Sequence, residues 1–281
     1  MRDHLKPTLI ISSTGKTGRR VAERLEKRGI PTRIGSRSAD PPFDWDDRGS
    51  WAGALEGAGA AYVSYYPDIA MPGAVEAITA FAETAMGQDV RRLVLLSGRG
   101  EEEAQRAERA VRESGADWTI VRCSWFNQNF SEGFFAEGVV AGEVVLPHAA
   151  VPEPFVDVED VADVAATVLS EDGHVGQVYE LTGPRLLTFE EAVEEIAAAT
   201  GREIRYVPAS IEEYAAAARE HGVPDEVVEF LRYLFGEVLD GRNASLTDGP
   251  QRALGREPRD FSEFVQEAAA AGVWNAPERA G

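Results

Sequence analysis

The chain has 281 residues, of which 44% are hydrophobic, which is enough to bury the core of one large α/β domain or of a domain with a small lobe. Its formal charge of −20 argues against binding to nucleic acid or to an anionic membrane surface, because phosphate groups require clustered lysine and arginine. With one cysteine, Cys123, no signal-peptide core and no apolar run approaching ~20 residues, we expect a cytoplasmic protein without disulfides that does not enter membranes.

The first predicted element is an apolar strand that begins at Thr8 and runs into a glycine turn. The turn has the spacing Ser12-x-x-Gly15-x-x-Gly18, and the residues after it carry apolar side chains at helical intervals. A strand, a glycine turn and a helix N-terminus bind a dinucleotide pyrophosphate, because the glycines admit the phosphates and the first helical N–H groups meet their charge. The alternative is an ordinary tight connection, since the first glycine of the usual motif is a serine here.

The second predicted strand and its exit loop, Thr32–Ser38, indicate which dinucleotide is bound. Sites that prefer NAD usually place an acidic residue here to accept hydrogen bonds from the ribose hydroxyls. This chain instead has Arg37 between Ser36 and Ser38, and a guanidinium flanked by hydroxyls suits a 2′-phosphate. We therefore expect NADP(H) rather than NAD(H), unless Arg37 is only a solvated loop residue.

Strands and helices are predicted to alternate over about the first 180 residues. After the first two strands, we expect strands at 60–66, 92–97, 117–122 and 177–181, and helices at 70–86, 101–114 and 159–169. The nearly all-apolar segment 92–97 is typical of a parallel sheet whose two faces are covered by helices. The pattern predicts a doubly wound, Rossmann-like α/β sheet that binds NAD(P).

From Thr188 the chain is predicted to be mostly helical. Thr188 and Glu191 have the spacing of a capping box, in which each side chain accepts a hydrogen bond from the other residue's backbone N–H. Helices are expected from there to Ala199, and at 211–220, 225–239 and 260–271. We therefore expect a nucleotide-binding domain at residues 1–185 and a small helical substrate lobe at residues 186–281.

Six segments together resemble a known family: Ser12–Arg20, Arg92–Ser97, Ser114–Arg122, Trp125–Phe130, Pro154–Ala162 and Tyr179–Pro184. They are similar to the NmrA-like branch of the atypical short-chain dehydrogenases/reductases, near the ergot-alkaloid iminium reductases and the quinone-reductase-like members. The resemblance covers roughly residues 8 to 274. It implies an extended Rossmann fold, NADPH as the cofactor and a small-molecule substrate, and we expect a monomer or a homodimer.

The resemblance also implies roles for individual residues. The pyrophosphate would be held by Ser12, Thr14, Gly15, Lys16, Thr17 and Gly18, and the 2′-phosphate by Ser36 and Arg37. Contacts to the adenine, the riboses and the nicotinamide would come from Asp44, from Tyr65, Tyr66 and Pro67, and from Ser97 and Gly98. The nicotinamide and substrate wall would be formed by Trp125, Phe126, Asn127, Phe130 and Phe134.

The chain departs from the usual dehydrogenase pattern. It contains no Tyr-x-x-x-Lys, so the tyrosine that protonates a carbonyl oxygen is missing. Glu108 looks like a helix glutamate of the aromatic-alcohol branch, but the lysine expected four residues earlier is Ala104. No catalytic residue is assigned on this basis. The histidines show no metal-ligand spacing, so no metal is expected.

The missing acid narrows the chemistry to substrates that need no dedicated proton donor. Hydride transfer to an iminium cation removes a charge, and a reduced quinone is a delocalised anion that solvent can protonate. A site that only positions the cofactor against such an electrophile can work by proximity and orientation. We expect an NADPH-dependent reductase of cyclic imines, iminium ions or quinones. The alternative is a non-catalytic NADP(H) sensor, because the resembled family includes such proteins.

Overall fold

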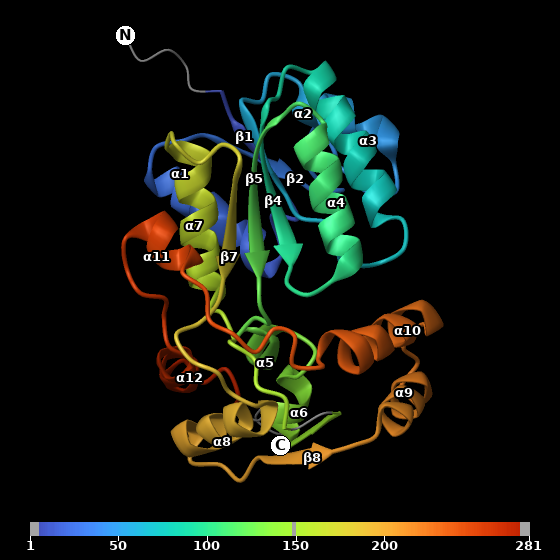
Figure 1. The fold of residues 1–281 in the computed structure, drawn as a ribbon, viewed down its shortest axis with the longest axis vertical. Coiled ribbons are helices and arrows are strands. Elements are labelled where there is room, and N and C mark those ends of the chain that lie inside the picture. The colour runs from blue at the N-terminus through green and yellow to red at the C-terminus, as the bar shows by residue number, and fades with distance from the viewer. Residues whose placement is uncertain (1–5, 148–149, 276–281) are drawn as a thin grey trace, which may run out of the picture. The chain divides into compact units, whose positions relative to one another are not determined.

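The computed structural model describes residues 6–147 and 150–275 (Figure 1). These residues form two compact units. We call the first the sheet unit, residues 6–123, 158–181 and 247–257, and the second the helical unit, residues 124–147, 150–157, 182–246 and 258–275. The units do not follow the expected break between residues 185 and 186. The chain leaves the sheet unit after Cys123, where the fifth strand of the sheet ends, and returns at Val158 to add a helix and the sixth strand.

Six parallel strands in the order β2-β1-β3-β4-β5-β7 form the sheet unit's framework. The strands are β1 (Thr8–Ile11), β2 (Thr32–Gly35), β3 (Ala60–Val63), β4 (Arg92–Gly98), β5 (Asp117–Cys123) and β7 (Gln177–Leu181). Every residue of β1 and β3 is buried, as expected for strands covered on both faces. The predicted Rossmann-like α/β sheet is confirmed.

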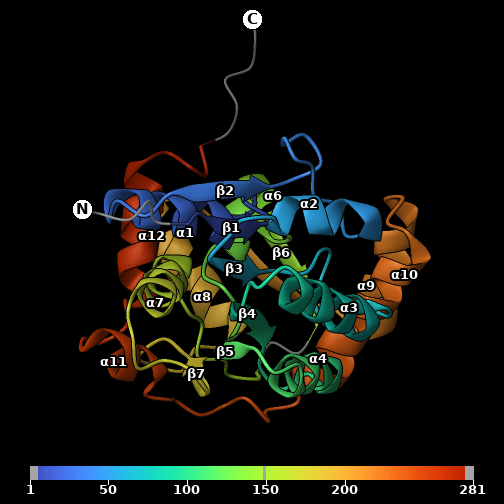
Figure 2. The ribbon, with the colours of Figure 1, turned by 90° about the horizontal axis from the view of Figure 1, so that it is seen from above.

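Helices cover both faces of this sheet (Figure 2). On one face lie α1 (Lys16–Lys27) and α7 (Val158–Ser170), with α11 (Gly249–Leu254) against α7 and β7; on the other lie α2 (Trp51–Leu55), α3 (Ala74–Gly87) and α4 (Glu102–Glu113). The strand order reverses at β1, because β2 pairs with one side of it and β3 with the other. Open α/β sheets bind ligands at the carboxyl ends of the strands at such a switch point.

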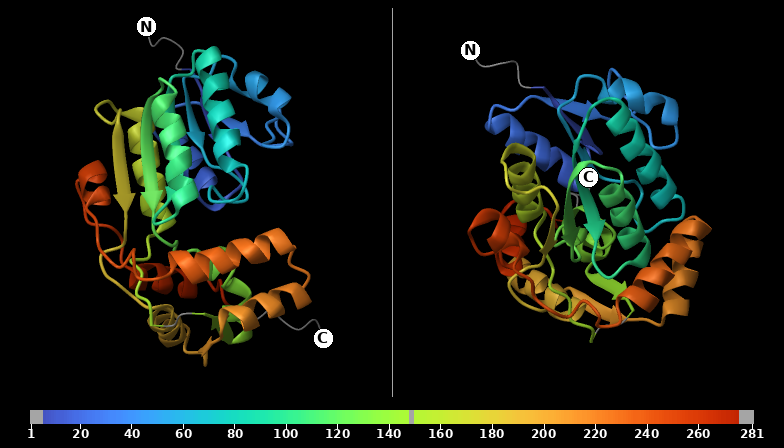
Figure 3. Two further views of the ribbon diagram at one scale, coloured as in Figure 1. Left: turned by 45° about the vertical axis from the view of Figure 1, so that its right-hand side comes forward. Right: turned by 45° about the horizontal axis from the view of Figure 1, so that its top comes forward.

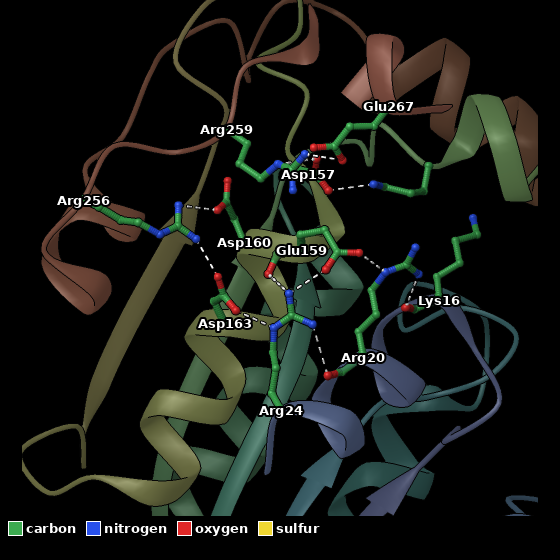
Figure 4. A network of polar contacts seen from close by, with 11 residues as sticks. Lys16, Arg20, Arg24, Asp157, Glu159, Asp160, Asp163, Arg256, Arg259 and Glu267 are labelled. Carbon is green, nitrogen blue, oxygen red and sulfur yellow. Dashed lines mark hydrogen bonds and ion pairs between the residues drawn. The ribbon is translucent and has the colours of Figure 1, made fainter. Parts of the chain in front are cut away.

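Ion pairs fasten α1 to α7 (Figure 4). The Arg20 Nε lies 2.5 Å from the Glu159 Oε1, and Arg24 pairs with both Glu159 and Asp163. Burial alone raises the pKa of Glu159, but the hydrogen bonds from Arg24 and Arg20 outweigh it and leave that pKa lowered. These contacts fix the direction of α1, the helix that follows the glycine turn.

Short helices and one pair of parallel strands make up the helical unit. They are α5 (Asn129–Glu132), α6 (Ala136–Ala141), α8 (Phe189–Thr200), α9 (Ile211–Glu220), α10 (Asp225–Tyr233), α12 (Phe261–Ala270), β6 (Glu143–Leu146) and β8 (Arg205–Pro208). Helices α9 and α10 lie side by side (Figure 3). The core of this unit is aromatic, and the rings of Phe155 and Phe189 have centroids 5.0 Å apart. The pair β6–β8 and the short helices α5, α6 and α11 were not expected from the sequence.

Local residues explain where the predicted elements begin and end. The capping box at Thr188 and Glu191 is confirmed. Helix α3 starts at Ala74 rather than at residue 70, because Pro72 and Gly73 precede it and Gly73 has a φ of +88°. Strand β3 ends three residues before its expected end, and helix α10 continues as a π-helical segment, Leu234–Val238.

Candidate functional site

The turn after β1 is so tight that residue 18 has no room for a side chain. A Cβ at Gly18 would lie 2.3 Å from the carbonyl oxygen of Ser12 and 3.0 Å from the Cα of Ser13. The N–H of Gly15 donates to the same carbonyl at 2.8 Å. The glycines therefore bring the start of α1 directly against the turn, as dinucleotide-binding turns require.

Ser12 replaces the motif's first glycine in a conformation that glycine favours. Its φ is +57°, in the left-handed region that costs most residues about 1–2 kcal/mol. The Ser12 hydroxyl donates to the carbonyl oxygen of Ser64 at 3.2 Å, so the serine gains a contact that glycine lacks. This bond joins the loops after β1 and β3, the two strands that flank the switch point.

Helix α1 starts at Lys16 without a side-chain cap, and its first turn holds no acidic residue. Helices α8, α9 and α12 each begin with a capping box instead. The first N–H groups of a helix have no acceptor within the helix, and the helix dipole makes that end positive. The start of α1 therefore has the chemistry of a phosphate site.

The loop after β2 presents Arg37 to solvent. The hydroxyl oxygens of Ser36 and Ser38 lie 3.4 Å apart on either side of it, and the Phe43 N–H donates to the Ser36 carbonyl at 2.9 Å to curl the loop. Within residues 6–147 and 150–275, no carboxylate pairs with the Arg37 guanidinium. Its charge and planar donors therefore remain available for an anion.

Asp44 lies in a turn that is anchored by a buried tryptophan. The indole Nε1 of Trp51 donates to the Asp44 carbonyl at 2.7 Å, and the Asp44 Oδ1 accepts the N–H of Asp46 at 3.1 Å. The Trp51 side chain, which is buried, therefore holds one end of this turn in place. Within the described part of the chain, the second carboxylate oxygen of Asp44 accepts no hydrogen bond.

The loop after β3 holds three of the predicted cofactor residues at different depths. The Tyr65 ring is half-buried, with its centroid 4.9 Å from the ring of Trp45, whose Nε1 donates to the Ser64 carbonyl at 3.2 Å. Tyr66 and Pro67 are exposed. Tyr65 therefore has a fixed ring beside the switch point, and Tyr66 and Pro67 form the solvent edge of the same loop.

Ser97 is already engaged in a buried polar network. Its hydroxyl donates to the Glu108 Oε1 at 2.6 Å, and Arg122 binds both oxygens of that carboxylate at 2.8 and 2.5 Å. The Glu108 side chain is only 2% exposed. Ala104 is fully buried, so no side chain from this position reaches solvent in place of the missing lysine. The network holds α4 to β4 and β5.

The five residues predicted for the substrate wall belong to the helical unit and differ in exposure. Phe130 is fully buried among other phenylalanine rings in the core of this unit. Asn127 is also fully buried, and neither atom of its amide has a hydrogen-bond partner in the described part of the chain. Trp125 and Phe126 are half-buried and Phe134 is 62% exposed, so these three present aromatic surface.

Sequence reasoning missed two carboxyl side chains, Asp68 and Glu101. They follow β3 and β4, within a few residues of the strand ends. The Glu101 carboxyl lies against Gly98, where a Cβ would come within 2.3 Å of its Oε2. The one available signal was an acidic residue soon after each of two predicted strands.

Residues 6–147 and 150–275 contain neither a metal-ligating cluster nor a membrane-spanning helix. No group of three or more histidine, cysteine, aspartate or glutamate side chains there is placed to hold a metal ion. No helix of that part is both long and apolar enough to cross a bilayer. Cys123 is buried, and burial raises the pKa of its thiol, so it is not a reactive thiolate.

Known proteins match this chain along most of its length. Residues 13–172 match the model of a family described as NAD(P)H-binding. The uncharacterized oxidoreductase YesF of Bacillus subtilis is 31% identical, over 95% of this chain and 96% of YesF. Agroclavine dehydrogenase of Claviceps fusiformis is 29% identical, over 92% of this chain and 96% of the dehydrogenase.

Among solved structures, the Escherichia coli NADPH-dependent quinone oxidoreductase QOR2, complexed with NADPH, superimposes with a TM-score of 0.78 at 21% identity, over 92% of this chain and 99% of that chain. This likeness agrees with the observed strand order and with the helices on both faces of the sheet. From the family match and these relatives, the chain is an NAD(P)H-dependent oxidoreductase that belongs to this NAD(P)H-binding family.

Proposed function

We propose that the chain is an NADPH-dependent reductase of a small organic electrophile, either a cyclic imine or iminium ion or a quinone. The observation that carries the proposal is the tight glycine turn before the uncapped start of α1, with Arg37 on the neighbouring loop. The names of two similar proteins, an agroclavine dehydrogenase and a quinone oxidoreductase, support the substrate class.

The residues present fit a dinucleotide. The N–H groups at the start of α1 bind the pyrophosphate, helped by the turn residues Ser12, Thr14, Gly15, Lys16, Thr17 and Gly18. Ser36 and Arg37 bind the 2′-phosphate, the second carboxylate oxygen of Asp44 accepts from the adenine amine, and Tyr65, Tyr66 and Pro67 line the riboses. Gly98, at the end of β4, borders the nicotinamide, and Ser97 positions that strand end through Glu108. Bound NADPH supplies the hydride.

On the substrate side, Trp125, Phe126 and Phe134 offer aromatic surface to a flat ring. The net charge of −20 favours a cationic substrate over an anionic one. Because the chain has no Tyr-x-x-x-Lys, a neutral ketone lacks its usual acid. Iminium ions and quinones are therefore the better substrates for this set of residues.

The function is tested by following NADPH absorbance with a panel of cyclic imines, N-alkylated iminium salts, quinones and ketones, with NADPH binding measured by calorimetry in parallel. We expect turnover of the iminium salts or quinones and none of the ketones. Tight NADPH binding without turnover of any compound would support the alternative, a non-catalytic NADP(H) sensor.

Replacing Arg37 with alanine should weaken NADPH binding by about 1.5–3 kcal/mol, the range for a hydrogen bond to a charged group, and leave NADH binding unchanged. Calorimetric titration with both dinucleotides measures this directly. Arg33→Ala is the matched control, because that guanidinium donates to the backbone carbonyls of Ala54 and Glu56 at 2.8 and 2.6 Å. The control should lower stability without changing the preference for NADPH. Equal losses for both dinucleotides in the Arg37 variant would contradict the assignment.

A further inference from the structure

Two carboxyl side chains come together at the ligand-binding edge of the sheet unit. Asp68 follows β3 and Glu101 follows β4, and these strands are parallel neighbours with Val63 opposite Leu95. Parallel neighbours end at the same edge of a sheet, as the arrows of β4 and β5 in Figure 1 show for the next pair. This edge is where open α/β sheets bind their ligands.

The Glu101 carboxyl is held at the end of β4 without a partner for one of its oxygens. A Cβ on Gly98 would lie 2.3 Å from the Oε2 and 2.5 Å from the Oε1, so the carboxyl rests directly on the glycine. The Oε2 is buried, although part of the residue is exposed, and it has no hydrogen-bond partner in the described part of the chain. A buried carboxylate oxygen without a donor is costly, and protonation of the carboxyl removes that cost.

Asp68 adds a second acid to this edge. Its Oδ1 accepts the N–H of Ala70 at 2.9 Å. Burial raises the pKa of Asp68 to about 6, against the effect of the Ala70 hydrogen bond. Burial also raises the pKa of Glu101, and the charge of Asp68 raises it further. Each ionised carboxylate makes ionisation of the other less favourable, so the pair favours retaining a proton.

The other charged and titratable groups on these two turns leave that proton in place. The Arg99 guanidinium pairs with Glu180 at 2.5 Å, on the strand beyond β5. Glu102 is exposed at the start of α4, and the Tyr65 phenol has a pKa raised by burial and by nearby acids, so it stays neutral. Of the charged groups around the Glu101 carboxyl, Asp68 is the one that shifts its pKa.

We propose that the Glu101 carboxyl, supported by Asp68, donates the proton that the nitrogen of a neutral imine takes up before hydride transfer. The proposal rests on the proposed function and explains how the neutral imines among its substrates would be protonated. Reduction of a C=N bond consumes one hydride, supplied by NADPH, which becomes NADP⁺, and one proton. The proton moves from the Glu101 carboxyl to the imine nitrogen, the resulting iminium pairs with the carboxylate, and water reprotonates the carboxyl after the amine forms.

The protonated carboxyl is tested first without cofactor or substrate. Infrared spectra of the wild-type protein at neutral pH should contain the carbonyl band of a protonated carboxylic acid, which disappears as the pH is raised and is absent from Glu101→Gln. A carboxyl with a raised folded-state pKa lowers the stability as the pH rises from its unfolded-state pKa to its folded-state pKa, because over that range the unfolded chain has released a proton that the folded state still holds. The full loss persists at higher pH. The Glu101→Gln variant should therefore melt about 2–4 °C above wild type at pH 8 and equal it at pH 4.

Activity then separates proton donation from binding. With a neutral cyclic imine, Glu101→Gln should lower kcat by about 100-fold, the lower end for a general acid. With the N-methylated iminium salt of the same ring, which needs no proton, kcat should stay within about twofold of wild type. Glu102→Gln, one residue along and exposed, is the matched control and should change neither. With the neutral imine, kcat should fall as the pH rises and Glu101 loses its proton. Asp68→Asn should shift this fall to lower pH, because it removes the negative charge that raises the pKa of Glu101.

The outcomes distinguish this proposal from the proposed function. If wild type reduces neither imine nor iminium nor quinone, the proposed function fails, and the infrared titration still decides whether Glu101 holds a proton. Equal losses on the neutral imine and the N-methylated salt would overturn Glu101 as a proton donor and leave it a binding residue. Absence of the carboxylic acid band in wild type at neutral pH would overturn the proton-holding pair itself.

Discussion

Gly18→Ala is expected to abolish tight NADPH binding while the protein still folds. The new Cβ would lie 2.3 Å from the Ser12 carbonyl oxygen and 2.8 Å from its carbon, so the start of α1 must move away from the turn. Each helix N–H that no longer reaches a phosphate oxygen should weaken NADPH binding by about 1.5–3 kcal/mol, which raises Kd by about 10- to 150-fold. The strain itself should lower the free energy of unfolding by about 1–3 kcal/mol. Calorimetric titration and urea unfolding measure the two effects.

Gly87→Ala is the matched control for this substitution. Gly87 ends helix α3 in the same unit, is exposed, and has no atom within 4 Å of the position its Cβ would take. Alanine there should leave NADPH affinity unchanged and the stability equal or slightly higher, because alanine is the better helix former. Unchanged NADPH affinity in the Gly18 variant would show that the turn does not hold the pyrophosphate.

Glu108→Ala is expected to give the largest loss of stability among single substitutions in the sheet unit that we propose. The substitution removes the carboxylate whose two oxygens bind the Arg122 guanidinium, and it removes the acceptor of the Ser97 hydroxyl. Removing one partner of a buried ion pair costs about 3–5 kcal/mol. We expect about 3 kcal/mol, because Arg122 is 21% exposed and keeps Glu180 at 3.4 Å. Urea unfolding followed by circular dichroism provides the measurement.

Glu103→Ala tests whether this loss comes from burial. Glu103 lies on the same helix and pairs with Arg106 at a similar distance, 2.6 Å, but its side chain is 39% exposed where that of Glu108 is 2% exposed. Exposed pairs contribute about 0–1 kcal/mol, so this variant should be close to wild type. If both variants lose the same stability, the polar network around Ser97 is not the reason that Glu108 matters.

The sequence predicted the strands of the sheet unit and the start of α8 well, because the signals for these elements are local. The apolar strands, the glycine turn and the capping box at Thr188 each depend on residues within a few positions of one another, and the structure confirms these elements. The short pair β6–β8 gave no such signal, because its strands have four residues each and the paired residues, such as Glu143 and Arg205, are 62 positions apart (205 − 143). Exposure was equally hard to predict. Phe130 and Phe134 are four residues apart, yet one is fully buried and the other 62% exposed.

The sequence by itself determined the fold class, the glycine turn between β1 and α1, and the absence of Tyr-x-x-x-Lys, because a strand, a turn and a helix start are specified by consecutive residues. Only the tertiary structure brought Asp68 and Glu101 to one sheet edge, since that depends on β3 and β4 being parallel neighbours. Likewise, only packing buried the Glu101 Oε2 without a donor and tied Ser97 to Glu108. The protonation of a carboxyl depends on its desolvation and on the charges near it in space, and neither can be predicted from the amino-acid sequence alone.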